Sequence, residues 1–209
     1  MQRMLEIKSF TFGPFGTNTY VVSDDEDNVL LVDPACSNPY EQQMLYRYIS
    51  NFKSQISNLK LSIVATHGHL DHLWGAKWAT EQWHTPVWMH EADIPMAQAM
   101  QQQYDLFGVR RTAETFPIEP ITNDKLPMTN VSIISTPGHT PGSICLHWPE
   151  EKVLLSGDTL FQMGYGRTDL PGGNMGQLID SLEHLFTLPA DTLVYPGHGA
   201  ETTIGEERR

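Results

Sequence analysis

A dense group of histidines and aspartates constrains this sequence more than any other feature. The segment from His67 to His72, which reads HGHLDH, directly follows Leu61–Ala65, an apolar run typical of a buried strand. Residues two apart in an extended loop point the same way, so His67 and His69 can bind one ion together. Asp71 and His72 fall where the loop is expected to become a helix, and they can bind a second ion. The segment therefore predicts a metal site at the end of a strand.

Three further polar residues recur in glycine-rich contexts, each just past the end of an expected strand. They are His139 in TPGHTPGS, Asp158 in SGDT and His198 in YPGHG. Loops beyond strand ends can converge on one crevice while the sheets behind them stay rigid. Histidines and aspartates in such positions suit a site for two divalent ions. Asp158 is the natural bridging ligand, because a carboxylate can offer one oxygen to each ion.

The rest of the chain alternates short β-rich runs with helical patterns, which indicates an α/β protein. A chain of 209 residues has room for one well-covered core, so we expect a single domain over residues 1–209. Helices are expected from Pro39, over Trp74–Trp83, over Asp93–Phe107 and from about Met175. Strands are expected at 5–10, 19–23, 29–32, 61–65, 87–89, 131–135, 143–148, 152–155 and 193–195.

Composition argues against several classes of partner and location. The net charge of −12, from 13 Lys and Arg against 25 Asp and Glu, repels a phosphate backbone, so we expect no nucleic-acid partner. Apolar runs fall far short of the roughly twenty residues that span a bilayer, so we expect no membrane partner. No signal-peptide pattern is visible, and two cysteines cannot build a disulfide framework. These features favour a cytoplasmic location.

The predicted ligands, together with the segment GYGRTDLPGG at 164–173, resemble the metallo-β-lactamase-fold superfamily and its small glyoxalase II-like hydrolases. The similarity extends over residues 11–209. It implies a four-layer αββα sandwich, with two mixed β-sheets, helices on the outer faces and metals in a groove at one edge. It also implies how the ligands divide: His67, His69 and His139 would hold the first metal, Asp71, His72 and His198 the second, and Asp158 would bridge them.

Two features narrow the choice within that superfamily. The β-lactamases of this fold lack the bridging aspartate, so Asp158 argues against that activity. Larger glyoxalase II enzymes carry a C-terminal helical domain that helps to bind glutathione, and this chain ends soon after His198. We therefore expect that domain to be absent. The thiol and the acyl group of the substrate stay undetermined.

The expected activity is hydrolysis of a hydroxyacyl thioester such as S-lactoylglutathione, a small-molecule substrate. Two divalent ions, zinc first and iron or manganese as alternatives, would share a water and lower its pKa to about 7. The bridging hydroxide would attack the thioester carbonyl, and a metal would stabilise the oxyanion. The thiolate leaves without a strong general acid, because thiols ionise at about pH 8.5. Asp71, which can orient the hydroxide, and Asp158 are the expected catalytic residues.

Two alternatives belong to other classes of function. A persulfide dioxygenase would use a single non-haem iron held by His67, His139 and Asp158. That family also carries a GRTD segment, but it typically continues with Phe-Gln where this chain reads LPGG. A non-catalytic module would use metals only to hold its fold or to bind a partner, whereas structural metal sites tend to be closed and rich in sulfur. The oligomeric state is left open.

Arg167 and Tyr165 are the expected substrate-binding residues. The guanidinium of Arg167 can clamp a substrate carboxylate, with a salt bridge to Asp169 as the alternative. Tyr165 can donate a hydrogen bond to the substrate or simply pack. The Met- and Gln-rich part of 91–126 can roof the groove or form an ordinary packing helix, so its role as a lid is open.

Several other residues are expected to have structural roles. Cys36 and Cys145 are interpreted as small apolar side chains rather than reactive thiols. Asn174 is expected to cap the helix that follows it, with Gln177 closing the capping box. Asp33 follows a strand and is expected to hold a metal ligand in place without binding the metal itself.

Overall fold

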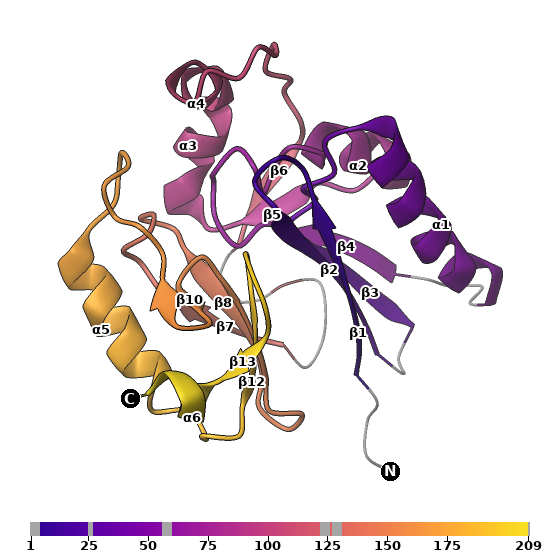
Figure 1. The fold of residues 1–209 in the computed structure, drawn as a ribbon. Coiled ribbons are helices and arrows are strands. Elements are labelled where there is room, and N and C mark those ends of the chain that lie inside the picture. Colours follow the sequence, from indigo (N-terminus) through magenta and orange to yellow (C-terminus); the bar gives the residue numbers. More distant parts are fainter. Residues whose placement is uncertain (1–4, 25–26, 56–59, 122–125, 127–130, 209) are drawn as a thin grey trace. The chain divides into compact units, whose positions relative to one another are not determined.

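The computed structural model describes residues 5–24, 27–55, 60–121, 126 and 131–208 (Figure 1). The chain divides into two compact units. Unit 1 comprises Met1–Ala65, His69–Trp88 and Met96–Glu119, and unit 2 comprises Thr66–Gly68, Met89–Pro95 and Pro120–Arg209. The assignment of one domain to residues 1–209 stays a prediction. Within the described residues, no helix combines the length and apolar character needed to cross a membrane.

Unit 1 contains most of a six-stranded mixed sheet with the strand order β1-β2-β3-β4-β5-β6. Its first three strands are antiparallel neighbours, whereas β3, β4 and β5 are parallel. Strands β2 and β3 are buried along their whole length, and the apolar runs Tyr20–Val22 and Val29–Val32 suit strands covered on both faces. The strands are β1 (Glu6–Phe12), β2 (Thr17–Ser23), β3 (Asn28–Val32), β4 (Lys60–Val64), β5 (Val87–Met89) and β6 (Ile118–Pro120).

Helix α1 (Pro39–Gln55) begins where the sequence predicts it. The Asn38 side chain accepts hydrogen bonds from the backbone N–H groups of Tyr40 and Glu41, at 3.0 and 3.1 Å. Helix α2 (Ala76–Trp83) lies within the predicted range. The predicted helix over 93–107 is wrong as a single element. The structure has a short 3-10 turn, η1 (Glu91–Asp93), followed by α3 (Ile94–Gln98) and α4 (Met100–Leu106).

Unit 2 contains a five-stranded mixed sheet with the strand order β13-β12-β9-β8-β7. Its core is formed by β8, β9, β12 and helix α5 (Met175–Leu185), which buries its apolar face. The larger strands are β7 (Ser132–Ser135), β8 (Ile144–Trp148), β9 (Val153–Gly157) and β12 (Leu193–Pro196). The short elements are the hairpin β10 (Leu160–Phe161) and β11 (Gly164–Tyr165), β13 (Thr202–Thr203) and α6 (Ile204–Glu207).

Strand direction determines which loops share a sheet edge. In unit 2, β12 is parallel to β9, and β8 is antiparallel to it. The loop that enters β8 and the loops that leave β9 and β12 therefore lie at the same edge. In unit 1, β3 is parallel to β4 and Val32 pairs with Val64, so Asp33 begins the next loop beside the end of β4. The prediction of an α/β fold with two large mixed sheets is confirmed.

Candidate metal centre

Four predicted metal ligands form a cluster in unit 2. His139 lies in the loop between β7 and β8, and Asp158 and His198 follow the parallel strands β9 and β12. The Nε2 atoms of His139 and His198 are each 3.5 Å from Asp158 Oδ2. The imidazole ring of His67 lies with its centroid 4.8 Å from that of His139. The pairing of the strands thus brings together side chains that are far apart in the sequence.

The other three predicted ligands belong to unit 1, in the loop between β4 and α2. His69 and His72 are buried, and Asp71 is partly buried. Asp71 Oδ2 accepts a hydrogen bond from Thr17 Oγ1 on β2 at 2.7 Å, and it lies 3.5 Å from His72 Nε2. Strand β2 therefore orients the carboxylate of Asp71, a contact that the HGHLDH motif does not predict.

Hydrogen bonds from outside the donor set determine the tautomers of two histidines. His139 Nδ1 lies 2.7 Å from the carbonyl oxygen of Arg167. Because a carbonyl can only accept, Nδ1 carries the proton and Nε2 carries the lone pair. His72 Nδ1 lies 2.8 Å from the carboxylate of Asp33, which has the same effect. The expectation that Asp33 supports a predicted ligand is confirmed.

The chemistry of these side chains fits divalent metal ions. Imidazole nitrogen with carboxylate oxygen is a donor set that zinc, iron and manganese accept, and the tautomers described above present Nε2 as a ligand atom. A cation would also offset the charge of carboxylates that are largely removed from water. The residues able to hold such ions are His67, His69, Asp71, His72, His139, Asp158 and His198.

Asp93 is a buried residue whose role the sequence analysis missed. Its Oδ2 accepts hydrogen bonds from Gly68 N and from Thr140 Oγ1, both at 2.7 Å, and its Oδ1 accepts one from Gly142 N at 2.6 Å. The carboxylate of Asp93 thereby joins two loops of unit 2, one that carries His67 and one that carries His139. No motif surrounds Asp93. The available signal was an acidic residue shortly after a strand.

Arg167 contributes its backbone carbonyl to the cluster, whereas its guanidinium pairs with Asp169. The Nε and Nη2 atoms each lie 2.6 Å from an oxygen of that carboxylate, and both side chains are exposed. The hydrogen bonds from Arg167 lower the pKa of Asp169 to about 2. The structure thus contains the salt bridge that was the alternative for Arg167. A substrate contact by Arg167, or by the exposed Tyr165, stays a prediction.

Gly166 allows the close approach on which this carbonyl contact depends. A Cβ atom at this position would lie 1.9 Å from the carbonyl oxygen of Asp158 and 2.9 Å from His139 Nδ1. Any side chain would therefore push the segment away from the cluster. The glycine of the GRTD segment is explained by packing against two predicted ligands.

A mixed α/β fold with histidines and aspartates just beyond its strand ends is typical of metal-dependent hydrolases. Residues 12–198 match the profile of the Metallo-beta-lactamase superfamily. The chain belongs to this superfamily.

Relatives of known name or structure cover nearly the whole chain. The hydroxyacylglutathione hydrolase GloC of Haemophilus influenzae is 34% identical over 201 residues, which cover 93% of this chain and 91% of GloC. TTHA1623, whose crystal structure is known in a di-iron-bound form, has 31% sequence identity to this chain, a TM-score of 0.84 and 97% of each chain covered. The B3 metallo-beta-lactamase BLEG-1 is 32% identical, with a TM-score of 0.83 and coverage of 97% and 96%. These likenesses confirm the expected superfamily and fold.

Proposed function

We propose that the protein hydrolyses hydroxyacyl thioesters of the S-lactoylglutathione type at a centre of two divalent ions. The observation that carries the proposal is the position of Asp158, whose Oδ2 lies 3.5 Å from an imidazole nitrogen of His139 and of His198. A carboxylate between two histidines is what a bridging ligand requires. The name of the relative GloC supports the class of substrate.

The predicted division of the ligands is retained in this proposal. One ion would be held by His67, His69 and His139, and Asp158 would supply a carboxylate to both ions. The second would be held by Asp71, His72 and His198, and the distance of 3.5 Å between Asp71 Oδ2 and His72 Nε2 within unit 1 supports the pairing of those two ligands. When bound, such ions lower the pKa of a water and polarise a substrate carbonyl. Zinc remains the first choice, and the di-iron form of TTHA1623 supports iron as an alternative.

The residues around the donors keep them in a fixed orientation. Asp33 holds the imidazole of His72, and the Arg167 carbonyl holds that of His139, so neither ring has to reorient when the substrate arrives. Thr17 fixes one oxygen of Asp71, the residue proposed to orient the attacking water. A thiolate leaving group needs no further acid at neutral pH, because its own pKa is about 8.5.

The decisive experiment is thiol release from S-lactoylglutathione by the metal-loaded protein, with oxygen uptake recorded in the same vessel. We expect thiol release without oxygen uptake. A chromogenic cephalosporin is assayed in parallel because of the likeness to BLEG-1, and we expect turnover of it to be much slower. Turnover of the cephalosporin alone would contradict the proposal.

A persulfide dioxygenase is the second candidate, and one observation favours it. His67, His139 and Asp158 lie in the same unit and form a set of two histidines and one carboxylate, which is the donor set of non-haem iron oxygenases. Oxygen consumption with glutathione persulfide, combined with no release of thiol from the thioester, would replace the hydrolase proposal with this one.

The cellular setting rests on the sequence alone. A cytoplasmic location and the lack of nucleic-acid and membrane partners remain proposals from charge and composition. Hydrolysis of a small, water-soluble thioester is compatible with all three.

A further inference from the structure

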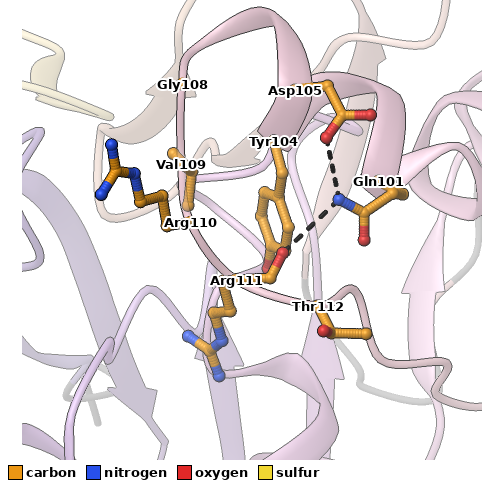
Figure 2. Close-up of a pocket in the computed structure, with 8 residues that line it drawn as sticks. All are labelled: Gln101, Tyr104, Asp105, Gly108, Val109, Arg110, Arg111 and Thr112. Atoms are coloured by element: carbon orange, nitrogen blue, oxygen red, sulfur yellow. Dashed lines mark hydrogen bonds between the residues drawn. The ribbon is translucent and has the colours of Figure 1, made fainter.

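Unit 1 contains a cavity of about 620 Å³, widely open to solvent, at the C-terminal end of α4 (Figure 2). Gln101, Tyr104 and Asp105 of that helix line it, together with the segment 108–112 that follows. The volume lies within the range of roughly 300–1,000 Å³ that is usual for small-molecule sites. None of these lining residues belongs to the predicted donor set.

Gln101 holds the lining segment against the helix. Its Nε2 donates a hydrogen bond to Asp105 Oδ1 at 3.0 Å, and its Oε1 accepts one from Ala113 N at 3.0 Å (Figure 2 shows the first). The backbone N–H of Val109 donates to the carbonyl oxygen of Tyr104 at 2.8 Å. The cavity wall is therefore formed before any ligand binds, which reduces the entropy lost on binding.

Two adjacent arginines line this cavity in a chain whose net charge is −12. Arg111 Nη2 reaches Glu114 at 3.5 Å, and both side chains are partly exposed, so this pair is weak. In the part of the chain that the structure describes, no acidic group pairs with Arg110. Lys152, by contrast, lies 2.5 Å from the carboxylate of Asp191. The lining residues thus carry two positive charges against the one negative charge of Asp105, which makes the cavity cationic in an acidic chain.

Tyr104 adds an aromatic wall with a polar end. Its side chain is almost fully buried, and its ring lies 6.0 Å from that of Trp74. A tyrosine hydroxyl has a pKa of about 10 and is protonated at neutral pH, so it can donate a hydrogen bond, and burial raises the pKa of Tyr104 further. The acidic lining residue, Asp105, already accepts a hydrogen bond from Gln101.

We propose that this cavity binds a small organic anion that carries a carboxylate or a phosphate group, with Arg111 as its cationic ligand. The guanidinium of Arg110 points in a different direction from that of Arg111 (Figure 2), so Arg110 adds a nearby positive charge rather than a second contact. A guanidinium binds either group through paired N–H donors in a planar fork. The anion would displace the weak contact of Arg111 with Glu114.

Helix α4 separates this cavity from the loop of predicted metal ligands. Gln103 Oε1 accepts a hydrogen bond from Leu70 N at 2.9 Å, between His69 and Asp71. On a helix, Gln101 lies on the same face as residues three and four positions further on, whereas residue 103 points to the opposite side. The anion site is therefore separate from the donor set within unit 1.

Binding of inorganic phosphate and of glutarate to the metal-loaded protein tests the proposal without any turnover. Nuclear magnetic resonance follows the Gly108 amide and the arginine Nε–H groups, which localises the ligand. We expect saturable shifts and binding at least about tenfold weaker in Arg111→Gln, because that variant loses charge-assisted hydrogen bonds. The loss in Arg110→Gln should be smaller, because that variant loses only a nearby positive charge. Arg47→Gln, an exposed arginine on α1 outside the cavity, is the matched control and should bind as the parent does.

The two probes identify the source of the anion. Shifts with phosphate alone support a phosphoryl ligand, and shifts with glutarate alone support a carboxylate ligand. Absence of a saturable shift at Gly108, or equal affinity in the parent and both cavity variants, would overturn the proposal. Because no substrate is converted, this result stands whether or not the protein hydrolyses thioesters.

Discussion

Single residues outside the donor set prepare the predicted ligands for metal. The carboxylate of Asp33 and the carbonyl of Arg167 each accept a hydrogen bond from the Nδ1–H of a histidine, His72 and His139 respectively. Nε2 of each ring is thereby left as the ligand atom. Asp93 acts one step further out, because it holds backbone and hydroxyl donors of two loops rather than a ligand itself. Function at this scale depends on hydrogen bonds that orient the ligands.

The substitution Asp93→Asn should loosen both loops. An amide nitrogen cannot accept the hydrogen bonds that a carboxylate oxygen accepts, so at least one buried donor loses its partner. We expect the free energy of unfolding to fall by about 1–3 kcal/mol and the bound metal per chain to decrease. Urea unfolding and elemental analysis check this. Asp191→Asn, at an exposed carboxylate, is the control, and unchanged stability in Asp93→Asn would contradict the assigned role.

Both cysteines should be unreactive in the folded protein. Burial raises the pKa of Cys36 to about 12 and that of Cys145 to about 11, so almost no thiolate is present at pH 8. A disulfide-exchange reagent should label neither cysteine at pH 8 and both in concentrated urea. Labelling of the folded protein within minutes would show that a thiol is accessible. The interpretation of both residues as small apolar side chains is confirmed by their burial.

At the scale of elements, helix α5 supports the loop that carries His139. Asn174 N donates a hydrogen bond to the carbonyl oxygen of Gly138 at 2.7 Å, and Ser181 Oγ donates to that of Pro137 at 2.8 Å. The Asn174 side chain accepts from Gln177 N at 3.1 Å, which confirms the predicted N-cap. The prediction that the Gln177 side chain closes a capping box is wrong, because the Asn174 N–H donates to Gly138 instead. The N-terminal end of the helix and the ligand loop are thus held together.

Removal of this cap should cost stability without removing a predicted ligand. For Asn174→Ala we expect a loss of about 1 kcal/mol and a fall in Tm of about 2–4 °C, measured by calorimetry. Asn174→Asp keeps an oxygen acceptor at the same place and should retain the stability of the parent. A fall of equal size in both variants would show that the hydrogen bond to Gln177 contributes nothing.

Patterns of apolar residues predicted the longer elements and not the shortest ones. Helix α5 is visible because Leu178, Leu182 and Leu185 recur at helical spacing and are all buried. The two-residue strands β10, β11 and β13 have too few positions for any periodicity, and they form because neighbouring segments supply their partners. The predicted ligands could be found because each lies in a glycine-rich motif. Asp93 could not, because its partners lie 25 to 49 residues away along the chain.

At the scale of the whole molecule, charge and metal are linked. A net charge of −12 makes the folded chain repel itself, and two of its carboxylates, those of Asp71 and Asp158, belong to the predicted donor set. Two divalent ions would add four positive charges and so reduce the net negative charge of the chain. Metal is therefore expected to contribute to stability as well as to chemistry.

Removal of metal should lower the thermal stability of the entire protein. An ion that binds only the folded chain stabilises it by about 2.7 kcal/mol when its concentration is a hundred times its Kd. We therefore expect Tm to fall by several degrees after treatment with a chelator and to recover when zinc is restored. Magnesium is the control and should not restore it, because it prefers oxygen ligands in octahedral geometry. Added salt should raise the Tm of the metal-free protein more than that of the loaded one, because it screens the larger uncompensated charge. Equal Tm values with and without metal would mean that the donor set is occupied too weakly to support the fold.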